Sequence, residues 1–434
     1  MRTVLLCSLL FTGLFSAIAQ DTLLTLDRAI ELALQNNFDI RIAHDQREQA
    51  ANNSNAGTAG MLPRVDLNGA YAKTIGDSKQ HLSSGLGVDK NNAVSDNTSA
   101  NVALTWTVFD GLKMFATRKK LAELAAQGDQ ALKIRIENTI AQVITAYYGI
   151  VQQRQLLGSL GRQIAVAEEV VRINDRKATN GAGSRLDLLL ASADLNAQRS
   201  EQITTQAAMD DAKVSLRNLL ALDATTNYSV QDTVIITYDP SLEQLMNDAG
   251  KQNSTLLLYD RQQRIAELGV KEYEAMHLPV INLNGAYQFA RAENNASFLL
   301  LNQSLGYTFG VTATLPLFNG SRLNTQVKNA KLDLLVAQLE YAQEQHALNA
   351  DVLKAWQEFQ SRKSMMALEE GNIADAREIL AIAEERFRVG ASSLIELKDA
   401  KNTYGAAMRR LAGARYDAKL AETELRRLAG VLVR

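Results

Sequence analysis

Residues that commonly carry chemistry are few and scattered in this sequence of 434 residues. The four histidines show no spacing typical of metal ligands; they are His44, His81, His277 and His346. The one cysteine is Cys7, and the sequence holds no glycine-rich phosphate loop, nucleophile elbow or paired zinc motif. We therefore expect no catalytic residue, no metal site and no cofactor, and we expect that the protein is not an enzyme.

One pair of acidic residues, Glu396 and Asp399, could still act on ions. They lie three residues apart, so in a helix they share one face. Several copies of the chain around an axis would bring these carboxylates into a ring, which attracts cations and narrows a pore. The alternative is an ordinary solvated helix face on which Lys398 and Lys401 balance the two acids.

Gly181 and Gly390 each follow a long helix-forming stretch. Glycine commonly lies just past the last residue of a helix, and Ser184 and Ser393 are placed where each can cap the next helix. Both glycines are therefore expected in tight turns that join two helices.

The stretches before these turns predict very long helices. The sequence has four prolines, and none of them lies within 112–180 or 321–389. At about 1.5 Å per residue, each stretch would extend roughly 100 Å. Three-four spacing in the first stretch is typical of a coiled-coil seam and involves Ile136, Ile140, Val143, Tyr147 and Ile150. Two shorter helices, over 26–61 and 184–222, would together match the length of one long helix.

The sequence also contains an internal duplication. Residues 62–71 match residues 278–287 at seven of ten positions, and the tripeptide 109–111 matches 318–320. The offsets are 216 and 209, so the two copies differ by seven residues between these points. We place the first repeat at 20–222, the linker at 223–240 and the second repeat at 241–431.

Each repeat contains two segments in which apolar and polar residues alternate. They are 64–75 and 98–109 in the first repeat, and 279–290 and 304–318 in the second. The alternation predicts strands with one apolar face, at a length that suits a tilted bilayer crossing. Four aromatic residues are candidates for a belt at the membrane interface: Tyr71, Trp106, Tyr287 and Tyr307. The alternative is a sheet with one face packed on soluble helices.

Closure of such a sheet requires more than one chain. Polar loops over 76–98 and 291–303 are expected to join the strands of each pair. Four strands cannot close a barrel, and an open edge in lipid would leave backbone groups without hydrogen bonds. Two copies would give eight strands, whose interior side chains fill, whereas three give twelve strands and a lumen. We therefore expect a trimer.

The N-terminal segment predicts export from the cytoplasm. Arg2 precedes an apolar run over 4–18 that ends in small residues, so we interpret 1–19 as a signal peptide. A membrane-anchoring helix is the alternative, although the run is shorter than the about 20 residues of a span. Cleavage would leave a chain without cysteine, and the formal net charge of −2 for the whole sequence excludes a basic surface for nucleic acid.

The duplicated order of elements, the Leu-Pro start of each first strand, the tripeptides at 109–111 and 318–320 and the glycine turns resemble the TolC family of outer-membrane efflux proteins. The resemblance implies an α+β fold of mainly long helices plus four strands per chain. It also implies a homotrimer with a 12-stranded barrel in the lipid of the outer membrane and a helical barrel in the periplasm. Two departures are visible, since Leu112 and Ser321 replace a second glycine common in the family and no lipidated N-terminal cysteine exists.

The resemblance assigns roles to residues near the turns. It places the acid pair of the periplasmic entrance at Glu396 and Asp399, and Asp187 holds the matching place in the first repeat. Asp187 and Phe387 are expected to tie the closed state. The turns are expected to form the closed end of the channel and the docking surface for a periplasmic adaptor, through Gly181, Ser184, Gly390 and Ser393.

The function expected from this resemblance is the outer-membrane channel of a tripartite efflux or type I secretion system. Such a channel is a passive exit duct for substrates that an inner-membrane pump delivers through the adaptor. A soluble periplasmic coiled-coil adaptor is the first alternative, and it predicts extraction without detergent. An independent diffusion porin is the second, and it has no need of long helices.

Overall fold

The computed structural model describes residues 22–433, so the signal peptide expected over 1–19 lies outside the described residues. The chain folds as two compact units. We call them the helical unit, residues 22–41, 136–245 and 352–433, and the strand unit, residues 42–135 and 246–351. The described chain is mainly helical, and none of its helices combines the length and apolar character that a membrane crossing requires.

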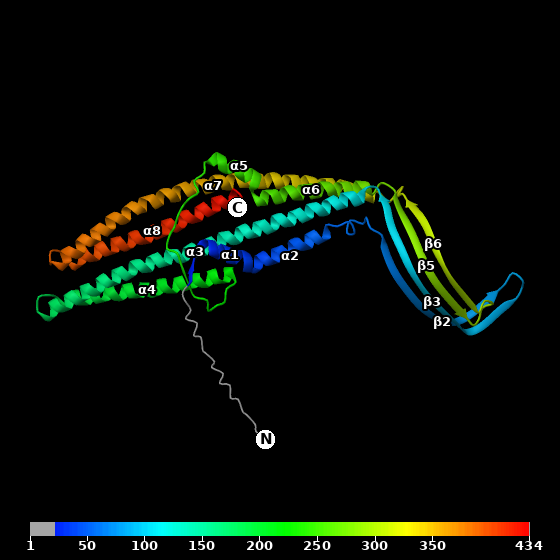
Figure 1. The fold of residues 1–434 in the computed structure, drawn as a ribbon, viewed down its shortest axis with the longest axis horizontal. Helices are drawn as coiled ribbons and strands as arrows, with labels where there is room; N and C mark the ends of the chain where they lie inside the picture. The colour runs from blue at the N-terminus through cyan, green and yellow to red at the C-terminus, as the bar shows by residue number, and fades with distance from the viewer. Residues whose placement is uncertain (1–21, 434) are drawn as a thin grey trace, which may run out of the picture. The chain divides into compact units, whose positions relative to one another are not determined.

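The strand unit contains one antiparallel sheet of four strands (Figure 1). The strands are β2 (Arg64–His81), β3 (Gly87–Asp110), β5 (Val280–Asn294) and β6 (Leu301–Thr314). Their order is β2-β3-β5-β6, so the hairpin of each repeat lies beside the other through β3 and β5. Within the described chain β2 and β6 are the edge strands, and each has one edge without a neighbouring strand.

The strands differ in length from the sequence prediction. The expected loop over 76–98 is mostly strand, because β2 and β3 stay paired as far as His81 and Gly87. This part has polar residues on both faces, so it lacks the alternation by which a strand with one apolar face is detected. β5 likewise continues to Asn294, whereas β6 ends at Thr314, two residues before Pro316. Proline has no N–H to donate to a sheet.

The pairing register gives the sheet two chemically different faces. One row of directly paired residues is Leu67, Val102, Tyr287 and Tyr307, and the next row on the same face is Val65, Leu104, Gly285 and Phe309. The opposite face carries the row Asn68, Asn101, Gln288 and Gly306. The apolar face is uncovered, with Phe309 81% exposed. No layer of helices packs on this face in the described chain, which argues against the soluble-sheet alternative.

The polar face is held together by side-chain hydrogen bonds between neighbouring strands. Asn68 donates to Asn101 at 2.9 Å, and Asn284 donates to Thr312 at 3.0 Å. Thr107 donates its hydroxyl proton to Asn282 at 2.8 Å. Cross-strand polar pairs of this kind satisfy one another while leaving groups free for water.

Each hairpin leads into a long helix through a left-handed turn. In the first repeat Gly111 and Leu112 have φ of 73° and 70°. In the second, Gly320 and Ser321 have φ of 66° and 64°. Leu112 and Ser321, which replace the second glycine common in the family, therefore adopt a left-handed backbone although each carries a side chain. This conformation costs about 1–2 kcal/mol per residue.

Gly111 is required for a second reason as well. A Cβ atom there would lie 2.3 Å from the carbonyl oxygen of Ala275 and 2.6 Å from Cβ of Leu278. At the matching Gly320 nothing lies within 4 Å, so only the first repeat makes this close approach.

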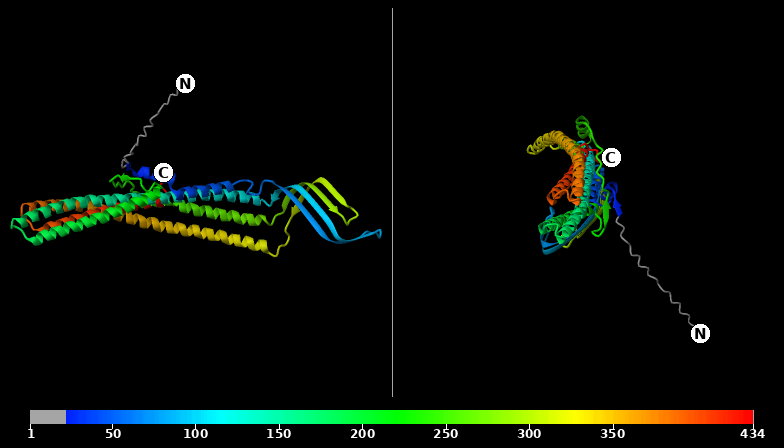
Figure 2. Two further views of the ribbon diagram at one scale, coloured as in Figure 1. Left: turned by 90° about the horizontal axis from the view of Figure 1, so that it is seen from below. Right: turned by 90° about the vertical axis from the view of Figure 1, so that its left-hand side faces the viewer.

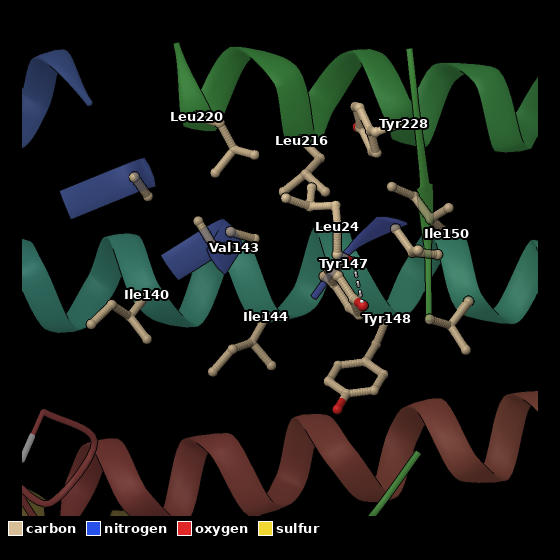
Figure 3. Packing of buried hydrophobic residues seen from close by; sticks show 14 residues of the cluster. Leu24, Ile140, Val143, Ile144, Tyr147, Tyr148, Ile150, Leu216, Leu220 and Tyr228 are labelled. Carbon is tan, nitrogen blue, oxygen red and sulfur yellow. Dashed lines mark hydrogen bonds between the residues drawn. The ribbon is translucent and has the colours of Figure 1, made fainter. Parts of the chain in front are cut away.

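The long helices α3 (Lys113–Thr179) and α7 (Arg322–Arg388) have 67 residues each and contribute to both units. Within the helical unit α4 (Arg185–Leu220) lies beside α3, and α8 (Leu394–Leu428) lies beside α7 (Figures 1 and 2). Four of the five predicted seam residues on α3 are buried and pack with Leu216 and Leu220 of α4: Ile140, Val143, Tyr147 and Ile150 (Figure 3). The fifth, Ile136, is partly buried against the same cluster.

The expected helix over 26–61 is two helices, α1 (Leu26–Asn36) and α2 (Phe38–Asn53). The break is at Asn37, whose side-chain oxygen accepts from the N–H groups of Asp39 and Ile40 at 2.9 and 3.2 Å. Its amide also donates to the carbonyl of Leu219 at 2.8 Å, which ties the break to α4.

The second repeat has the same break. Helices α5 (Leu242–Gln252) and α6 (Ser254–Ala275) meet at Asn253, whose side chain accepts from the N–H of Leu256 at 3.0 Å. An asparagine that caps the following helix satisfies backbone donors that would otherwise lack partners. The two breaks therefore have the same cause.

The linker contains a short strand that was not predicted. β4 (Tyr228–Val230) pairs in parallel with β1 (Thr22–Leu24). The hydroxyl of buried Tyr147 donates to the carbonyl of Leu24 at 2.9 Å (Figure 3). It also accepts from the N–H of Gln231 at 3.0 Å. Burial raises the pKa of Tyr147, so the hydroxyl keeps its proton and joins the two strands.

Candidate functional site at the helical hairpin ends

The two hairpin turns of the helical unit have the same backbone structure. Gly181 and Gly390 have φ of 74° and 79°. In the first turn the N–H of Ala182 bonds to the carbonyl of Lys177 at 2.8 Å, and in the second Ala391 bonds to Arg386 at 2.7 Å. These are Schellman turns, in which glycine provides the left-handed residue after a helix end.

The serine caps are present in both turns. Ser184 Oγ accepts from the N–H of Leu186 at 3.0 Å at the start of α4. Ser393 Oγ accepts from the N–H of Glu396 at 3.2 Å at the start of α8. The glycine and the serine cap fix the chain direction at each hairpin. The first helical turns of α4 and α8 therefore have a defined orientation.

Glu396 and Asp399 are both exposed near the start of α8. Glu396 lies 3.8 Å from the guanidinium of Arg386 on α7. The expected balancing role of Lys401 is wrong, because Lys401 is buried and pairs with Asp194 of α4 instead. The exposed acid pair thus faces solvent with Lys398, which is also exposed, as its neighbour on α8.

Asp187 and Phe387, which are expected to tie the closed state, have different surroundings in the structure. Phe387 is buried against Val170, Ala191 and Leu397, with the Lys177 ammonium 5.2 Å from its ring centre. Asp187 lies half-buried in the first turn of α4, where its charge is favourable beside the positive end of the helix dipole.

A group of exposed apolar side chains that was not predicted lies at the same end of the hairpins. They are Leu186, Leu189 and Leu190 on α4, Val389 after α7 and Ile395 on α8. The three leucines occupy positions i, i+3 and i+4, so they share one helix face. That spacing was available in the sequence as a signal. Exposed apolar residues grouped in this way are typical of protein-interaction surfaces.

The pKa values of two neighbouring acids beside the second turn are shifted in opposite directions. Glu385 forms hydrogen bonds to Arg388, and that contact holds the pKa of its carboxyl below the ordinary value. Burial raises the pKa of Glu384, the next residue along the chain, although Lys401 opposes the shift. The two carboxylates therefore face different environments, one solvent-exposed and the other between helices.

The four aromatic candidates lie at three positions along the register of the sheet. Tyr71 and Trp106 lie near opposite ends of the apolar face, whereas Tyr287 and Tyr307 pair directly with each other midway between them. Tyr71 donates to Asp96 at 2.7 Å, and Trp106 donates to the carbonyl of Met61 at 3.0 Å. In register, eight residues separate Tyr71 from Trp106, since Tyr71 pairs with Thr98. That is about 27 Å along a strand, close to the height of a membrane apolar band.

One cluster of potential metal ligands was not anticipated. His44, Asp45 and Glu48 on α2 place their ligand atoms within 4.8 Å of one another. The i, i+4 spacing of His44 and Glu48 was the signal in the sequence. All three side chains are exposed, and exposed acidic groups are common without an ion, so we assign the cluster no function.

Comparison with known proteins gives consistent matches over nearly the whole chain. A family model described as outer membrane efflux protein matches residues 29–222 and 245–431. Protein CyaE of Bordetella pertussis is 25% identical over 390 residues, covering 88% of this chain and 81% of that protein. Outer membrane protein TolC of Escherichia coli is 21% identical over 432 residues, covering 96% and 84%. The crystal structure of the Campylobacter jejuni CmeC outer membrane channel superposes with a TM-score of 0.79 at 19% identity, covering 94% and 86%.

Proposed function

The chain belongs to the outer membrane efflux protein family, and from this premise we propose that three copies assemble into one duct across the outer membrane and the periplasm. The protein is an outer-membrane exit channel for efflux and secretion, with its helical part in the periplasm. In this assembly the four strands of each copy supply one third of a 12-stranded barrel.

The sheet is the observation that carries the proposal. It has a polar face, an uncovered apolar face and two free edges, on β2 and β6. In lipid each free edge would leave several backbone groups without partners, at a cost of several kcal/mol per group. Pairing β6 of one copy with β2 of the next removes every edge when the ring closes. The apolar face then meets lipid, and the polar face lines a lumen.

The exposed face of α7 supports the same assembly. Four apolar residues there follow the spacing i, i+3, i+4 and i+7 and are about half exposed or more: Leu332, Leu335, Val336 and Leu339. This spacing is that of a coiled-coil seam, and in the described chain the stripe is uncovered. A helix of a neighbouring copy is its proposed occupant, because closure of the strands brings neighbouring copies together at the same time.

The hairpin ends are the proposed docking surface for a periplasmic adaptor, which connects the duct to an inner-membrane pump. Support comes from the two defined turns, at Gly181 with Ser184 and at Gly390 with Ser393, and from the exposed apolar residues beside them. In this proposal, as the family resemblance implies, cargo that the pump delivers passes passively through the lumen.

Detergent extraction with native mass measurement and planar-bilayer conductance tests this function. We expect particles of three chains that extract only with detergent and conduct ions after insertion. A monomer that extracts into buffer, as the soluble-adaptor alternative requires, would overturn the proposal.

The acid pair gives a sharper test of where the lumen narrows. In a trimer Glu396 and Asp399 would contribute six carboxylates, and clustered charges attract multivalent cations most strongly. Replacing both by alanine should raise the half-blocking concentration of a trivalent lanthanide, applied from the periplasmic side, by about tenfold or more, equivalent to about 1.4 kcal/mol. Glu385→Ala is the matched control, since Glu385 is an exposed acid on the same hairpin. Equal block of the wild type and the double variant would show that the pair lies outside the pore.

A further inference from the structure

A cavity of about 430 Å³ lies in the strand unit between the first turns of α3 and the last turns of α6. In this unit α3 begins and α6 ends beside the sheet (Figure 1). The floor of the cavity is buried and consists of small and apolar residues: Gly111, Ala116, Leu268 and Ala275. Its rim carries three exposed apolar side chains: Leu112, Phe115 and Leu278. The cavity is therefore an apolar hollow that opens to the outside of the chain.

This cavity lies on the side of the apolar face of the sheet. A second cavity, of about 930 Å³, lies between the same two helices and the polar face, where Asn282 lines it. The two cavities share no residue. On α3, Lys113 and Thr117 line the second cavity, whereas Phe115 and Lys119 line the first. Two residues correspond to about 200° around a helix, so the two cavities lie on opposite sides of α3.

The rim of the first cavity continues the apolar face of the sheet. The last residue pair on that face is Phe109 with Ile281. Gly111 and Leu278 follow this pair after two and three residues. Trp106 lies on the same face close to this end, and tryptophan is enriched where a membrane meets water. In the duct proposed above, where this face meets lipid, the cavity opens at the periplasmic border of the membrane.

One lysine at the cavity has no acidic partner. Lys119 lines the cavity and forms no ion pair with any residue that the structure describes. The acids nearby are already paired, because Lys271 binds Glu267 at 2.7 Å and Lys331 binds Glu274 at 2.9 Å. Three lysines beside two glutamates leave one positive charge. The cavity therefore combines an apolar rim with one free cation, which complements a ligand with an apolar body and an anionic head.

The duplication of the sequence does not produce this cavity twice. At the offset of 209, Phe115 matches Asn324, which is polar. Lys119 matches Lys328, so the second repeat keeps the lysine without the aromatic residue of the rim. The combination of apolar rim and free cation is thus particular to the first repeat.

We propose that the cavity binds one anionic phospholipid from the periplasmic leaflet of the outer membrane. The phosphate lies at the ammonium of Lys119, and the acyl chains continue from Phe115 and Leu278 along the apolar face of the sheet. Only the position of the membrane rests on the proposed function above. A lysine whose stem lies on apolar surface and whose ammonium lies at the boundary with water is well suited to a lipid headgroup.

Native mass spectrometry of the full chain counts bound lipids directly. The purified protein is titrated with phosphatidylglycerol, whose headgroup is anionic, and separately with phosphatidylcholine, whose headgroup has no net charge. We expect one phosphatidylglycerol per chain and weaker binding of phosphatidylcholine. Lys119→Gln should weaken the binding of phosphatidylglycerol about fivefold, equivalent to about 1 kcal/mol for one lysine at a membrane surface, and leave phosphatidylcholine unchanged.

Matched variants separate the apolar and the charged contribution. Phe115→Asn introduces the residue of the second repeat and should weaken both lipids about tenfold, because it removes apolar contact. Lys113→Gln removes a lysine of the same helix that lines the other cavity, and both lipids should bind as to the wild type. Helix content from circular dichroism identifies any variant that fails to fold.

Three outcomes would overturn the lipid site. The first is equal binding of phosphatidylglycerol to the wild type and to Lys119→Gln. The second is displacement of phosphatidylglycerol by excess inorganic phosphate, which would show an anion site that needs no lipid. The third is a loss of trimers in Phe115→Asn with an unchanged number of lipids per chain, which would show that a neighbouring copy covers the rim.

The outcomes for the lipid site and for the duct are separate. All the residues that line the cavity belong to one chain, so binding can be measured whatever the number of chains in a particle. A wild-type protein that does not conduct would overturn the proposed function. Fivefold weaker binding of phosphatidylglycerol to Lys119→Gln would still support the lipid site.

Discussion

Tryptophan in place of both Gly181 and Gly390 should abolish efflux while the assembled protein persists. Both glycines have a positive φ, and no atom lies within 4 Å of the position that a Cβ would take. The substitution therefore costs the backbone strain of a left-handed residue, about 1–2 kcal/mol per site, and causes no clash in the described chain. The bulky side chains would project from the two turns that we propose as the docking surface.

The measurement is tolerance to an exported compound in a host without its own outer-membrane efflux channel. We expect the inhibitory concentration to fall about tenfold or more, because bulk at the centre of an interface removes at least about 1.4 kcal/mol of binding. Gly181→Ala and Gly390→Ala carry the same backbone strain without the bulk and should keep most of the tolerance.

A further control is Gly85→Trp, in the turn between β2 and β3. Gly85 has φ of 85° and open space around it, so the physical change is the same at a site without a proposed adaptor contact. Tolerance of the Gly85→Trp variant to the exported compound should stay at the wild-type level. Wild-type tolerance with tryptophan at both hairpin turns would show that the adaptor binds elsewhere.

The features that the sequence predicted well are those with a repeated local pattern. The four strands alternate with a period of two residues because one face is apolar and the other polar, and this pattern persists in the register of β5 and β6. The ends of α3 and α7 were predictable because glycine after a helix and serine before the next are strong local signals. Both hairpin turns lie where the sequence placed them.

The missed features depend on contacts between distant segments. Strands β1 and β4 have three residues each, too few for any period, and Tyr147 joins them from α3. The break at Asn37 is set by a helix cap and by the carbonyl of Leu219, which is 182 residues away in the chain. Local composition cannot reveal such partners.

In the candidate site, too, features with a local pattern were predictable and contacts between distant segments were not. Exposure of Glu396 and Asp399 follows from their position in the first turns of a helix. Lys401 lies two residues further, yet its carboxylate partner is 207 residues away on α4. In the sequence, a lysine beside acids is expected to be exposed to solvent. Only the packing of α4 on α8 shows that Lys401 is buried.

The largest effect on stability is expected from Glu422→Ala. Glu422 of α8 is 0% exposed and holds the linker between the repeats. Its carboxylate accepts from the backbone N–H groups of Thr237 and Tyr238 at 3.1 and 2.9 Å. The ammonium of Lys419 and the guanidinium of Arg426 donate to it at 2.7 and 3.1 Å. Removal leaves two backbone donors and two partly buried cations without their common partner, and breaking a buried pair by removing one partner costs about 3–5 kcal/mol.

The free energy of unfolding in urea measures this cost, and limited proteolysis within 231–240 shows whether the linker is released. Glu424→Ala is the matched control, because Glu424 lies two residues away and pairs with Arg427 while its side chain is 45% exposed. Exposed pairs contribute about 0–1 kcal/mol, so this variant should stay near the wild-type stability. Equal losses of unfolding free energy in the two variants would show that Glu422 does not hold the linker.

The pH dependence of the stability difference between the wild type and Glu422→Gln tests whether the charge on Glu422 contributes to stability. Burial alone would raise its pKa, but the hydrogen bond and charge of Lys419 and the two linker N–H groups outweigh burial, and the pKa lies below the ordinary value. A lowered folded-state pKa gives stability that is fully present above the unfolded value of about 4.3 and is lost as the pH falls through the folded-state pKa. The stability difference between wild type and Glu422→Gln should therefore be constant near neutral pH and shrink below about pH 4. A difference that stays constant through that range would mean that the carboxylate anchors the linker by its shape and hydrogen bonds, without its charge.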